Sequence, residues 1–308
     1  MKHDAIHGSQ EPLGGLESTA ARPAGKYMDW KVDWAFKKVF SDKEVASKLL
    51  RDILREDIVD IEFLSNEIPA LSEKDKRARL DVICQTSDGR SFVCEMQKKA
   101  ESDLRDRLLF YGSHLIVNQV KRGDPLYTLS PVYVLCITDF EMEHDGEIPP
   151  GKILFGYHLR ENDLGQDIFA DRLSFHILEL PRLARQKKFE EMTDSAEKWA
   201  YMFQNIATFA GQPESVPEFS RAVELSRVDS LTQEEKNQYH NAMVSEYEKL
   251  GISTAYEQIG HKKGLEEGLE KGIEQGKMEV ARKMKEMDLT TEQISQATGL
   301  SPQAIAAL

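Results

Sequence analysis

One β-hairpin constrains what this chain can fold into more than any other feature. Two short apolar-rich segments, Leu80–Cys84 and Phe92–Gln97, flank the polar sequence Thr-Ser-Asp-Gly-Arg at 86–90. Apolar runs of this length on either side of a Gly-containing polar segment are typical of two antiparallel strands and their turn. Each predicted strand carries one acid among its apolar residues, Asp81 in the first and Glu95 in the second.

The two acids of the hairpin indicate a cation site. Carboxylates among apolar neighbours are costly to desolvate unless a positive charge lies between them, and Mg²⁺ prefers oxygen ligands. Side chains two apart in a strand share a face, so Glu95 and Gln97 point the same way. Asp88-Gly89 alone would suggest a two-residue loop, which puts Asp81 opposite Met96. If the two acids share a metal they must face the same side, which needs an odd number of loop residues, so a three- or five-residue loop, or a bulge, is predicted. The alternative is that both acids lie at strand ends and face water.

The spacing of these polar residues resembles a known nuclease motif. Asp81 followed by Glu95-x-Gln97 is similar to the core of PD-(D/E)XK nucleases, with Gln where Lys is usual. Further residues follow in order, namely Lys76-Arg77-Ala78-Arg79-Leu80-Asp81-Val82 before the hairpin, then Arg107, Tyr111, Gly123 and Tyr127-x-Leu129-x-Pro131-Val132 after it. The whole series resembles the PD-(D/E)XK nuclease family transposases, also called recombination-promoting nucleases, over residues 29 to 180.

The resemblance implies a fold, an activity and a set of site residues. The fold would be a restriction-endonuclease-like α/β fold, with a mixed-sheet core flanked by helices and a helical C-terminal extension. The activity would be Mg²⁺- or Mn²⁺-dependent cleavage of DNA, linked to recombination or transposition, with Asp81 and Glu95 as the metal ligands. The residues that match the family pattern are Asp81, Glu95, Gln97 and Asp33 as catalytic groups, and Lys37, Arg79, Arg107 and Tyr111 as substrate-binding groups.

Simpler roles for several of these residues stay open at this stage. Asp33 is well placed to cap a helix that begins there. Arg107 and Tyr111 are four apart in a predicted helix over 102–121, where an arginine stem can simply pack on a ring. Gln97 can orient water by hydrogen bonds but carries no charge, which suits a slow enzyme. A catalytically silent scaffold that binds DNA or protein is therefore the alternative function.

Composition excludes some classes of protein. A formal net charge of −13 argues against a protein that coats DNA indiscriminately, because that affinity comes from phosphate neutralisation. No apolar run approaches a membrane span, and no export signal is recognised at the N-terminus. Three cysteines in predicted strands indicate reduced thiols and a cytoplasmic location. A local basic rim for DNA phosphates would come from Lys74, Lys76, Arg77, Arg79, Lys98 and Lys99.

The predicted domain order begins with a disordered segment, 1–26, and continues with a nuclease-like core, 27–180. Within the core, strands are expected at 58–64, 131–138, 153–159 and 173–180 in addition to the hairpin, which gives a sheet of five or six strands. The segment 131–138 is apolar throughout, which is typical of a strand buried on both faces. The helix before it predicts a parallel crossover from the hairpin.

The remainder is predicted to be helical, with a region at 181–255, a repeat at 256–287 and a helix-turn-helix-like cap at 288–308. In the repeat, Gly recurs at every fourth position from Gly260 to Gly276. Each Gly costs a helix about 1 kcal/mol relative to Ala, so a close partner backbone, and hence a homo-oligomer, is expected. The alternative is a flexible linker. In the cap, Thr291 is expected to be the N-cap residue of the first helix, and Ser301-Pro302 is expected to start the second.

Overall fold

The computed structural model describes residues 25–65, 67–68, 78–120, 123, 125–169, 172–184 and 187–308. Side chains are described for these residues except at 67–68, 78–79, 250, 253–267 and 269–270. Nearly all of the segment 1–26, predicted to be disordered, lies outside the described residues. The chain separates into two compact units, Met1–Val244 and Ser245–Leu308, which are described one at a time.

The first unit is a mixed α/β fold built on a six-stranded sheet. In spatial order the strands are β1 (Glu62–Phe63), β4 (Val82–Gln85), β5 (Ser91–Gln97), β6 (Val132–Thr138), β8 (Leu173–Glu179) and β7 (Leu154–His158). The strands β5, β6 and β8 run parallel, and the others pair antiparallel with their neighbours. A separate two-stranded pair joins β2 (Glu67–Ile68) to β3 (Ala78–Arg79). This mixed sheet is the nuclease-like α/β architecture that the sequence predicts.

The hairpin of β4 and β5 has the loop parity that a shared cation site requires. Val82 pairs with Cys94, and Gln85 pairs with Ser91, which leaves a five-residue loop over 86–90. The loop closes through Thr86, whose N–H donates to the carbonyl of Arg90 and whose carbonyl accepts from Gly89. Gly89 has φ +90°, a backbone conformation that favours glycine. The prediction of an odd loop is confirmed, and the same register places Asp81 opposite Glu95.

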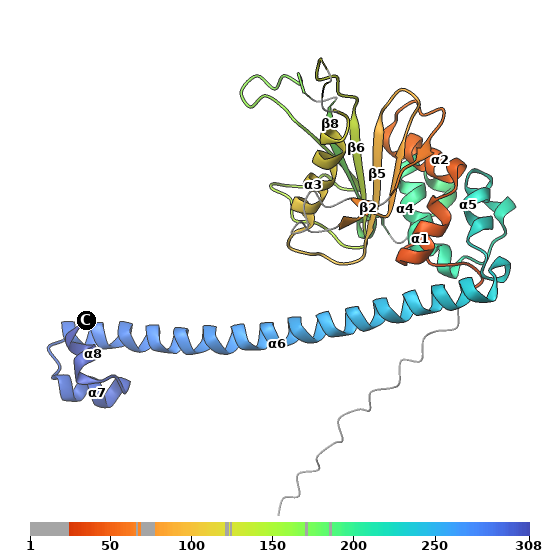
Figure 1. The fold of residues 1–308 in the computed structure, drawn as a ribbon. Helices are drawn as coiled ribbons and strands as arrows, with labels where there is room; N and C mark the ends of the chain where they lie inside the picture. The colour runs from red at the N-terminus through yellow and green to blue at the C-terminus, as the bar shows by residue number, and fades with distance from the viewer. Residues whose placement is uncertain are drawn as a thin grey trace, which may run out of the picture. The chain divides into compact units, whose positions relative to one another are not determined.

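Helices cover both faces of the sheet (Figure 1). The helix α3 (Leu104–Val117) connects β5 to β6 and packs on one face, against Val93, Val134 and Ile177. The opposite face is covered by α1 (Asp33–Phe40), α2 (Lys43–Leu54), α4 (Ser195–Asn205) and α5 (Ser220–Leu225), which enclose the larger apolar core. The parallel crossover through α3 is confirmed, and β6 is buried along nearly all of its length.

Three local predictions differ from the structure. The strand expected at 58–64 is limited to β1, since only Glu62 and Phe63 pair with β4. The helix expected over 102–121 is shorter and ends at Val117. Asp33 does not cap α1: Val32 is the N-cap residue, and the Asp33 carboxylate instead accepts from Lys37 one turn later.

The chain after β8 alternates short 3₁₀ segments with helices. The 3₁₀ segments are η1 (Leu180–Arg182), η2 (Phe189–Glu191), η3 (Ile206–Thr208), η4 (Pro213–Ser215), η5 (Pro217–Phe219) and η6 (Val228–Ser230). The long helix α6 (Gln233–Glu286) follows, and its first turns belong to the first unit. There Asp29 donates its N–H to the Tyr239 hydroxyl, and Lys38 pairs with Glu235.

The second unit contains the rest of α6, α7 (Thr291–Thr298) and α8 (Pro302–Ala306). The prediction that the glycine repeat is helical is confirmed. Thr290, not Thr291, caps α7, because its hydroxyl and the Gln293 side chain form a reciprocal capping box. A small apolar core joins the three helices through Ala281, Ile294 and Ile305. Among the described residues no helix is long and apolar enough to cross a membrane.

Candidate active site

Asp81 and Glu95 form a reciprocal pair at the open end of the hairpin. The backbone N–H of Asp81 donates to Glu95 Oε1 at 3.0 Å, and the N–H of Met96 donates to Asp81 Oδ2 at 3.0 Å. Glu95 alternates with Val93 on the face of the sheet covered by α3, and Asp81 directly precedes β4 beside it. Glu95 is only 2% exposed, which removes it almost completely from water.

The burial of this pair changes its protonation. Burial, together with the nearby Asp81 charge, raises the pKa of Glu95 to about 8. Burial also raises the pKa of Asp81 to about 6, although the Lys37 ammonium and the Met96 N–H act in the opposite direction. Two adjacent buried acids resist ionisation unless a cation compensates them. The electrostatics of the pair therefore favour binding of a positive charge.

Lys37 connects the first helix to this pair. Its ammonium lies 3.1 Å from Asp81 Oδ1 and 2.6 Å from Asp33 Oδ1. Burial opposes the charged form of Lys37, but the carboxylates of Asp81 and Asp33 prevail and raise its pKa. The side chain stays 28% exposed, so the ammonium is accessible at the edge of the site. The structure thus brings Asp33 and Lys37 to the hairpin acids, as the family resemblance implies.

Gln97 is held on both sides of its amide. Its Nε2 donates to Glu95 Oε2 at 3.1 Å, and its Oε1 accepts from Arg107 Nη2 at 3.1 Å. A lysine at this position could not accept the arginine hydrogen bond, so the glutamine suits a site in which α3 supplies a guanidinium. Arg107 also pairs with Glu101, and its buried Nε lacks a hydrogen-bond partner among the described residues.

Tyr111 lies one turn after Arg107 on α3 and is buried, with 6% of its surface exposed. Burial and the Glu95 charge raise the pKa of the Tyr111 hydroxyl, although the Arg107 guanidinium lowers it. The phenol therefore stays protonated beside the acids. This position suits a residue that supports Arg107 and Glu95 from within the core of the α3 face.

The predicted basic rim is described only in part. The backbone of Arg79 lies in β3, but its side chain, like Lys74, Lys76 and Arg77, falls outside the described residues. Lys98 and Lys99 directly follow β5 and are half-buried. Lys37 contacts Asp81 directly, and Arg107 reaches Glu95 through Gln97.

The carboxylate oxygens of Asp81 and Glu95 suit a hard divalent cation whose remaining ligands come from other molecules. The described residues contain no set of three or more His, Cys, Asp or Glu side chains arranged to hold a metal ion. Mg²⁺ is commonly bound through one or two carboxylates together with water and substrate phosphate oxygens. The buried pair of Asp81 and Glu95, whose raised pKa values a cation would reverse, matches that mode of binding.

Glu179 is a further buried acid, and no motif in the sequence points to it. It ends β8 and is fully buried, where it bonds to His144 and Arg182. The signal available in the sequence was an acid near the end of the predicted strand 173–180.

Comparison with family models gives a match over most of the chain. A family model described as "PD-(D/E)XK nuclease family transposase" matches residues 30–252. The chain belongs to this family. Comparison with curated proteins and with solved structures gave no match. The family match extends beyond residues 29–180 and includes α4 and α5, which share the large apolar core with the sheet. Membership supports a nuclease-like function, and nucleases of this family generally use divalent metal ions.

Proposed function

We propose that this protein is a metal-dependent DNA endonuclease that hydrolyses phosphodiester bonds and takes part in DNA recombination or transposition. The observation that carries the proposal is the buried Asp81–Glu95 pair, which faces one side of the sheet and has raised pKa values. Family membership supplies the reaction class. DNA is the partner that this reaction requires.

Asp81 and Glu95 would hold Mg²⁺ or Mn²⁺ together with water and a DNA phosphate oxygen. When bound, such a cation polarises the phosphate and lowers the pKa of a coordinated water. The chain's own groups fix the geometry. The Asp81 and Met96 N–H groups orient the two carboxylates, and the Gln97 amide donates to the second oxygen of Glu95, Oε2.

Lys37 and Arg107 are the groups that would meet the charge of the substrate. The exposed part of the Lys37 ammonium lies beside Asp81, where it can attract a phosphate oxygen. Arg107 reaches the site through Gln97 and retains further N–H donors for a phosphate. These two local cations allow the site to approach DNA in a chain whose net charge is −13.

The direct test is nicking of supercoiled plasmid by the purified protein. We expect conversion to open circles with Mg²⁺ or Mn²⁺ and none with EDTA. This assay also separates the enzyme from the alternative, a silent scaffold. A scaffold would bind DNA in a mobility-shift assay yet leave the plasmid intact with every divalent metal.

The pH dependence of nicking follows from the raised pKa values. Metal binding requires ionised carboxylates, and the pKa values of about 6 for Asp81 and about 8 for Glu95 leave the pair partly protonated at neutral pH. We therefore expect the nicking rate at subsaturating Mg²⁺ to rise between pH 6 and 8.5, and saturating Mg²⁺ to move the rise to lower pH. A rate that is flat across this range would contradict ionisation of the pair on metal binding.

A reducing, cytoplasmic setting suits the cysteines of this enzyme. Cys84, Cys94 and Cys136 are buried in the sheet and form no disulfide. Burial raises the pKa of Cys84 to about 12, so its thiol remains protonated. Because thiols in this state are poor nucleophiles, they serve as small apolar core residues here.

The glycine repeat of α6 is proposed to mediate self-association. A Cβ added at Gly268, Gly272 or Gly276 would meet no described atom within 4 Å, so packing within the chain does not require glycine there. Leucine at these three positions should block close approach of a second helix and lower the mass measured by sedimentation equilibrium. Leucine at the exposed Glu274 is the control. Equal masses for wild type and the triple variant would oppose the proposal.

A further inference from the structure

The polar row of the active site continues across the sheet. Gln97 of β5 pairs with Thr138 of β6, and Thr138 pairs with Glu179 of β8. Residues paired in register on parallel strands lie side by side, and strands are spaced by about 4.8 Å, so Glu179 is about 10 Å from Gln97 along the sheet. Both side chains point to the face covered by α3. A ligand bound next to Glu179 would therefore lie close to the proposed active site.

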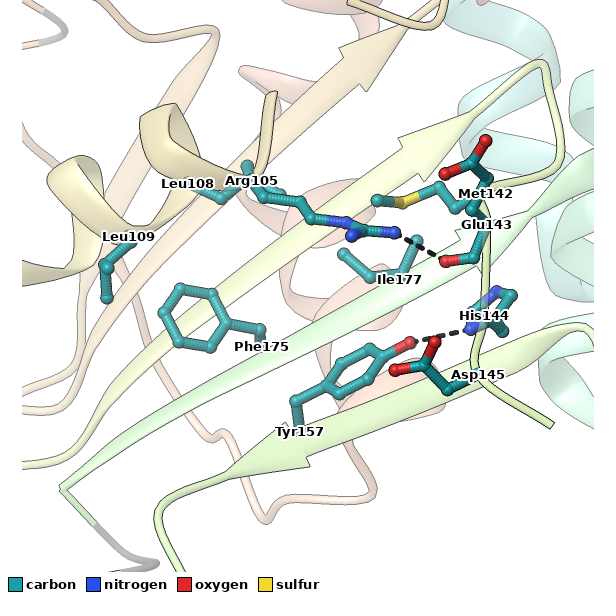
Figure 2. A pocket seen from close by; sticks show the side chains of 10 residues that line it. All are labelled: Arg105, Leu108, Leu109, Met142, Glu143, His144, Asp145, Tyr157, Phe175 and Ile177. Atoms are coloured by element: carbon teal, nitrogen blue, oxygen red, sulfur yellow. Dashed lines mark hydrogen bonds between the residues drawn. The ribbon is translucent and has the colours of Figure 1, made fainter. Parts of the chain in front are cut away.

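A cavity of about 560 Å³ opens beside His144, the partner of Glu179, between α3, the segment after β6 and the edge strand β7. Its apolar walls come from side chains of α3 and β8, chiefly Leu108, Leu109 and Phe175, and the Tyr157 ring adds a second aromatic surface (Figure 2). The polar groups at its rim are Arg105, Glu143 and Asp145. A volume of this size with apolar walls and few polar groups is typical of a small-molecule site.

A chain of hydrogen bonds connects the buried Glu179 to Tyr157. The carboxylate of Glu179 lies against His144 Nε2. The Tyr157 hydroxyl lies 3.0 Å from His144 Nδ1 (Figure 2). Arg182 holds the other oxygen of Glu179. A phenolic oxygen has two lone pairs, so whichever group donates in this hydrogen bond, the Tyr157 oxygen keeps acceptor capacity for a ligand.

The cavity thus combines two acceptors with one strong donor. The acceptors are the Tyr157 oxygen and the carboxylate of Asp145 (Figure 2). The donor is the Arg105 guanidinium, which the Glu143 carbonyl orients by a hydrogen bond (Figure 2). A matching ligand is flat and apolar on its faces. It carries an amino group for the acceptors and, elsewhere on its edge, an acceptor for the arginine.

We propose that this cavity binds a single unstacked nucleobase that carries an exocyclic amino group, adenine or cytosine in preference to thymine. Adenine offers an amino donor beside ring-nitrogen acceptors, and cytosine offers an amino donor, whereas thymine offers no amino group. Bases taken out of the stack are held between aromatic and apolar side chains and read along their edges, as these walls and rim allow. The cavity deepens the proposed nuclease function, on which its link to DNA rests, by reading a base near the cleaved phosphate.

The first test is calorimetric titration of the full-length protein with dAMP, dCMP, dTMP and inorganic phosphate. We expect dAMP or dCMP to bind at least about tenfold more tightly than dTMP, because thymine offers the acceptors a single N3–H in place of an amino group with two N–H donors. Phosphate alone should not compete with dAMP at equal concentration. Equal affinities for dAMP and dTMP, or full competition by phosphate, would overturn the proposal.

Matched variants locate the binding to this cavity. Leu109 and Phe110 are adjacent on α3 and similarly exposed, at 52% and 50%, but only Leu109 lines the cavity. Leu109→Ala should weaken dAMP binding, and Phe110→Ala should not. Asp145→Ala should remove the preference for dAMP over dTMP, while Glu147→Ala, in the same loop but outside the lining, should retain it. Loss of binding in both members of either pair would oppose the assignment.

Titration with single-stranded oligonucleotides distinguishes a base within DNA from a free nucleotide. The titration uses the Glu95→Gln protein, in which the proposed active site lacks a metal ligand. If the base belongs to DNA, Asp145→Ala in this background lowers the affinity for oligo-dA more than for oligo-dT. If the ligand is a free nucleotide, dAMP binding falls and both oligonucleotides are unaffected. Either result upholds the base site. Because none of these titrations depends on cleavage, a protein that binds dAMP yet never nicks DNA would refute the nuclease and not the cavity.

Discussion

Glu95→Gln is expected to abolish plasmid nicking while the protein remains folded. Glutamine has nearly the same size and its carbonyl can still accept from the Asp81 N–H, but it supplies no charge for a metal. Loss of a group that merely supports a metal ligand typically costs 10- to 100-fold, so loss of the ligand itself should reduce nicking by more than about 100-fold. The measurement is the initial rate on supercoiled plasmid with saturating Mg²⁺.

The same variant has an expected signature in stability. Because the folded protein raises the pKa of Glu95 to about 8 from an ordinary 4.5, metal-free wild type loses stability as the pH rises through that range. The glutamine of the Glu95→Gln variant does not ionise, so the variant does not lose stability in this way. Its melting temperature relative to wild type should therefore increase from pH 6 to pH 9 in EDTA. Mg²⁺ should stabilise wild type more at pH 9 than at pH 6, and should leave the variant unchanged.

Asp106→Asn, which removes an exposed acid of α3, is the matched control and should behave as wild type in both assays. Two outcomes would count against the site. If Glu95→Gln nicks at the wild-type rate, the activity arises elsewhere or from a contaminant. If its melting temperature relative to wild type does not change between pH 6 and pH 9, Glu95 does not titrate as the buried pair requires.

Lys37→Met is expected to give the second-largest effect, a loss of nicking of about tenfold or more at pH 7. Its ammonium contacts both Asp81 and Asp33, and it is the main charge that lowers the pKa of Asp81 against burial. A neighbouring opposite charge shifts a carboxyl pKa by about 1–3 units, so its removal leaves Asp81 protonated far more often. Raising the assay to pH 9 should restore part of the activity, and Lys37→Arg should retain most of it.

Lys38→Met is the control for this experiment, because Lys38 is the next residue of α1 and pairs with Glu235, away from the acids. It should leave the rate unchanged. A Lys37→Met protein whose loss is equal at pH 7 and pH 9 would show that Lys37 acts only as a phosphate contact. Wild-type activity in Lys37→Met would exclude both roles.

Several features of the molecule were predictable from local sequence alone. Side-chain alternation in a strand and the parity of a hairpin loop are properties of the backbone, so Asp81 and Glu95 can share a face only with an odd loop, and the observed pairing of Gln85 with Ser91 provides one. The apolar run of β6 likewise indicates a strand buried on both faces. The helical character of the tail is evident in its spacing, even though the glycines weaken it.

Capping residues were less certain because one side chain can serve two partners. Asp33 has the residue type of a helix cap, yet it accepts from Lys37 inside the helix, and Val32 is the N-cap residue. Thr290 and Thr291 have the same residue type, so each is equally suited to cap α7. The choice of Thr290 depends on the position of Gln293 three residues later, which completes the reciprocal pair of hydrogen bonds.

Only the tertiary structure decided which distant side chains meet. The contact of Lys37 with Asp81 depends on α1 packing at the end of the hairpin, and the contact of Arg107 with Gln97 depends on how the crossover returns along α3. The cavity beside His144 exists because β8 lies between β6 and β7, an order that chain sequence does not imply. Local patterns follow from the geometry of neighbouring residues. Contacts between elements depend instead on how the whole core packs, and no short stretch of sequence contains that information.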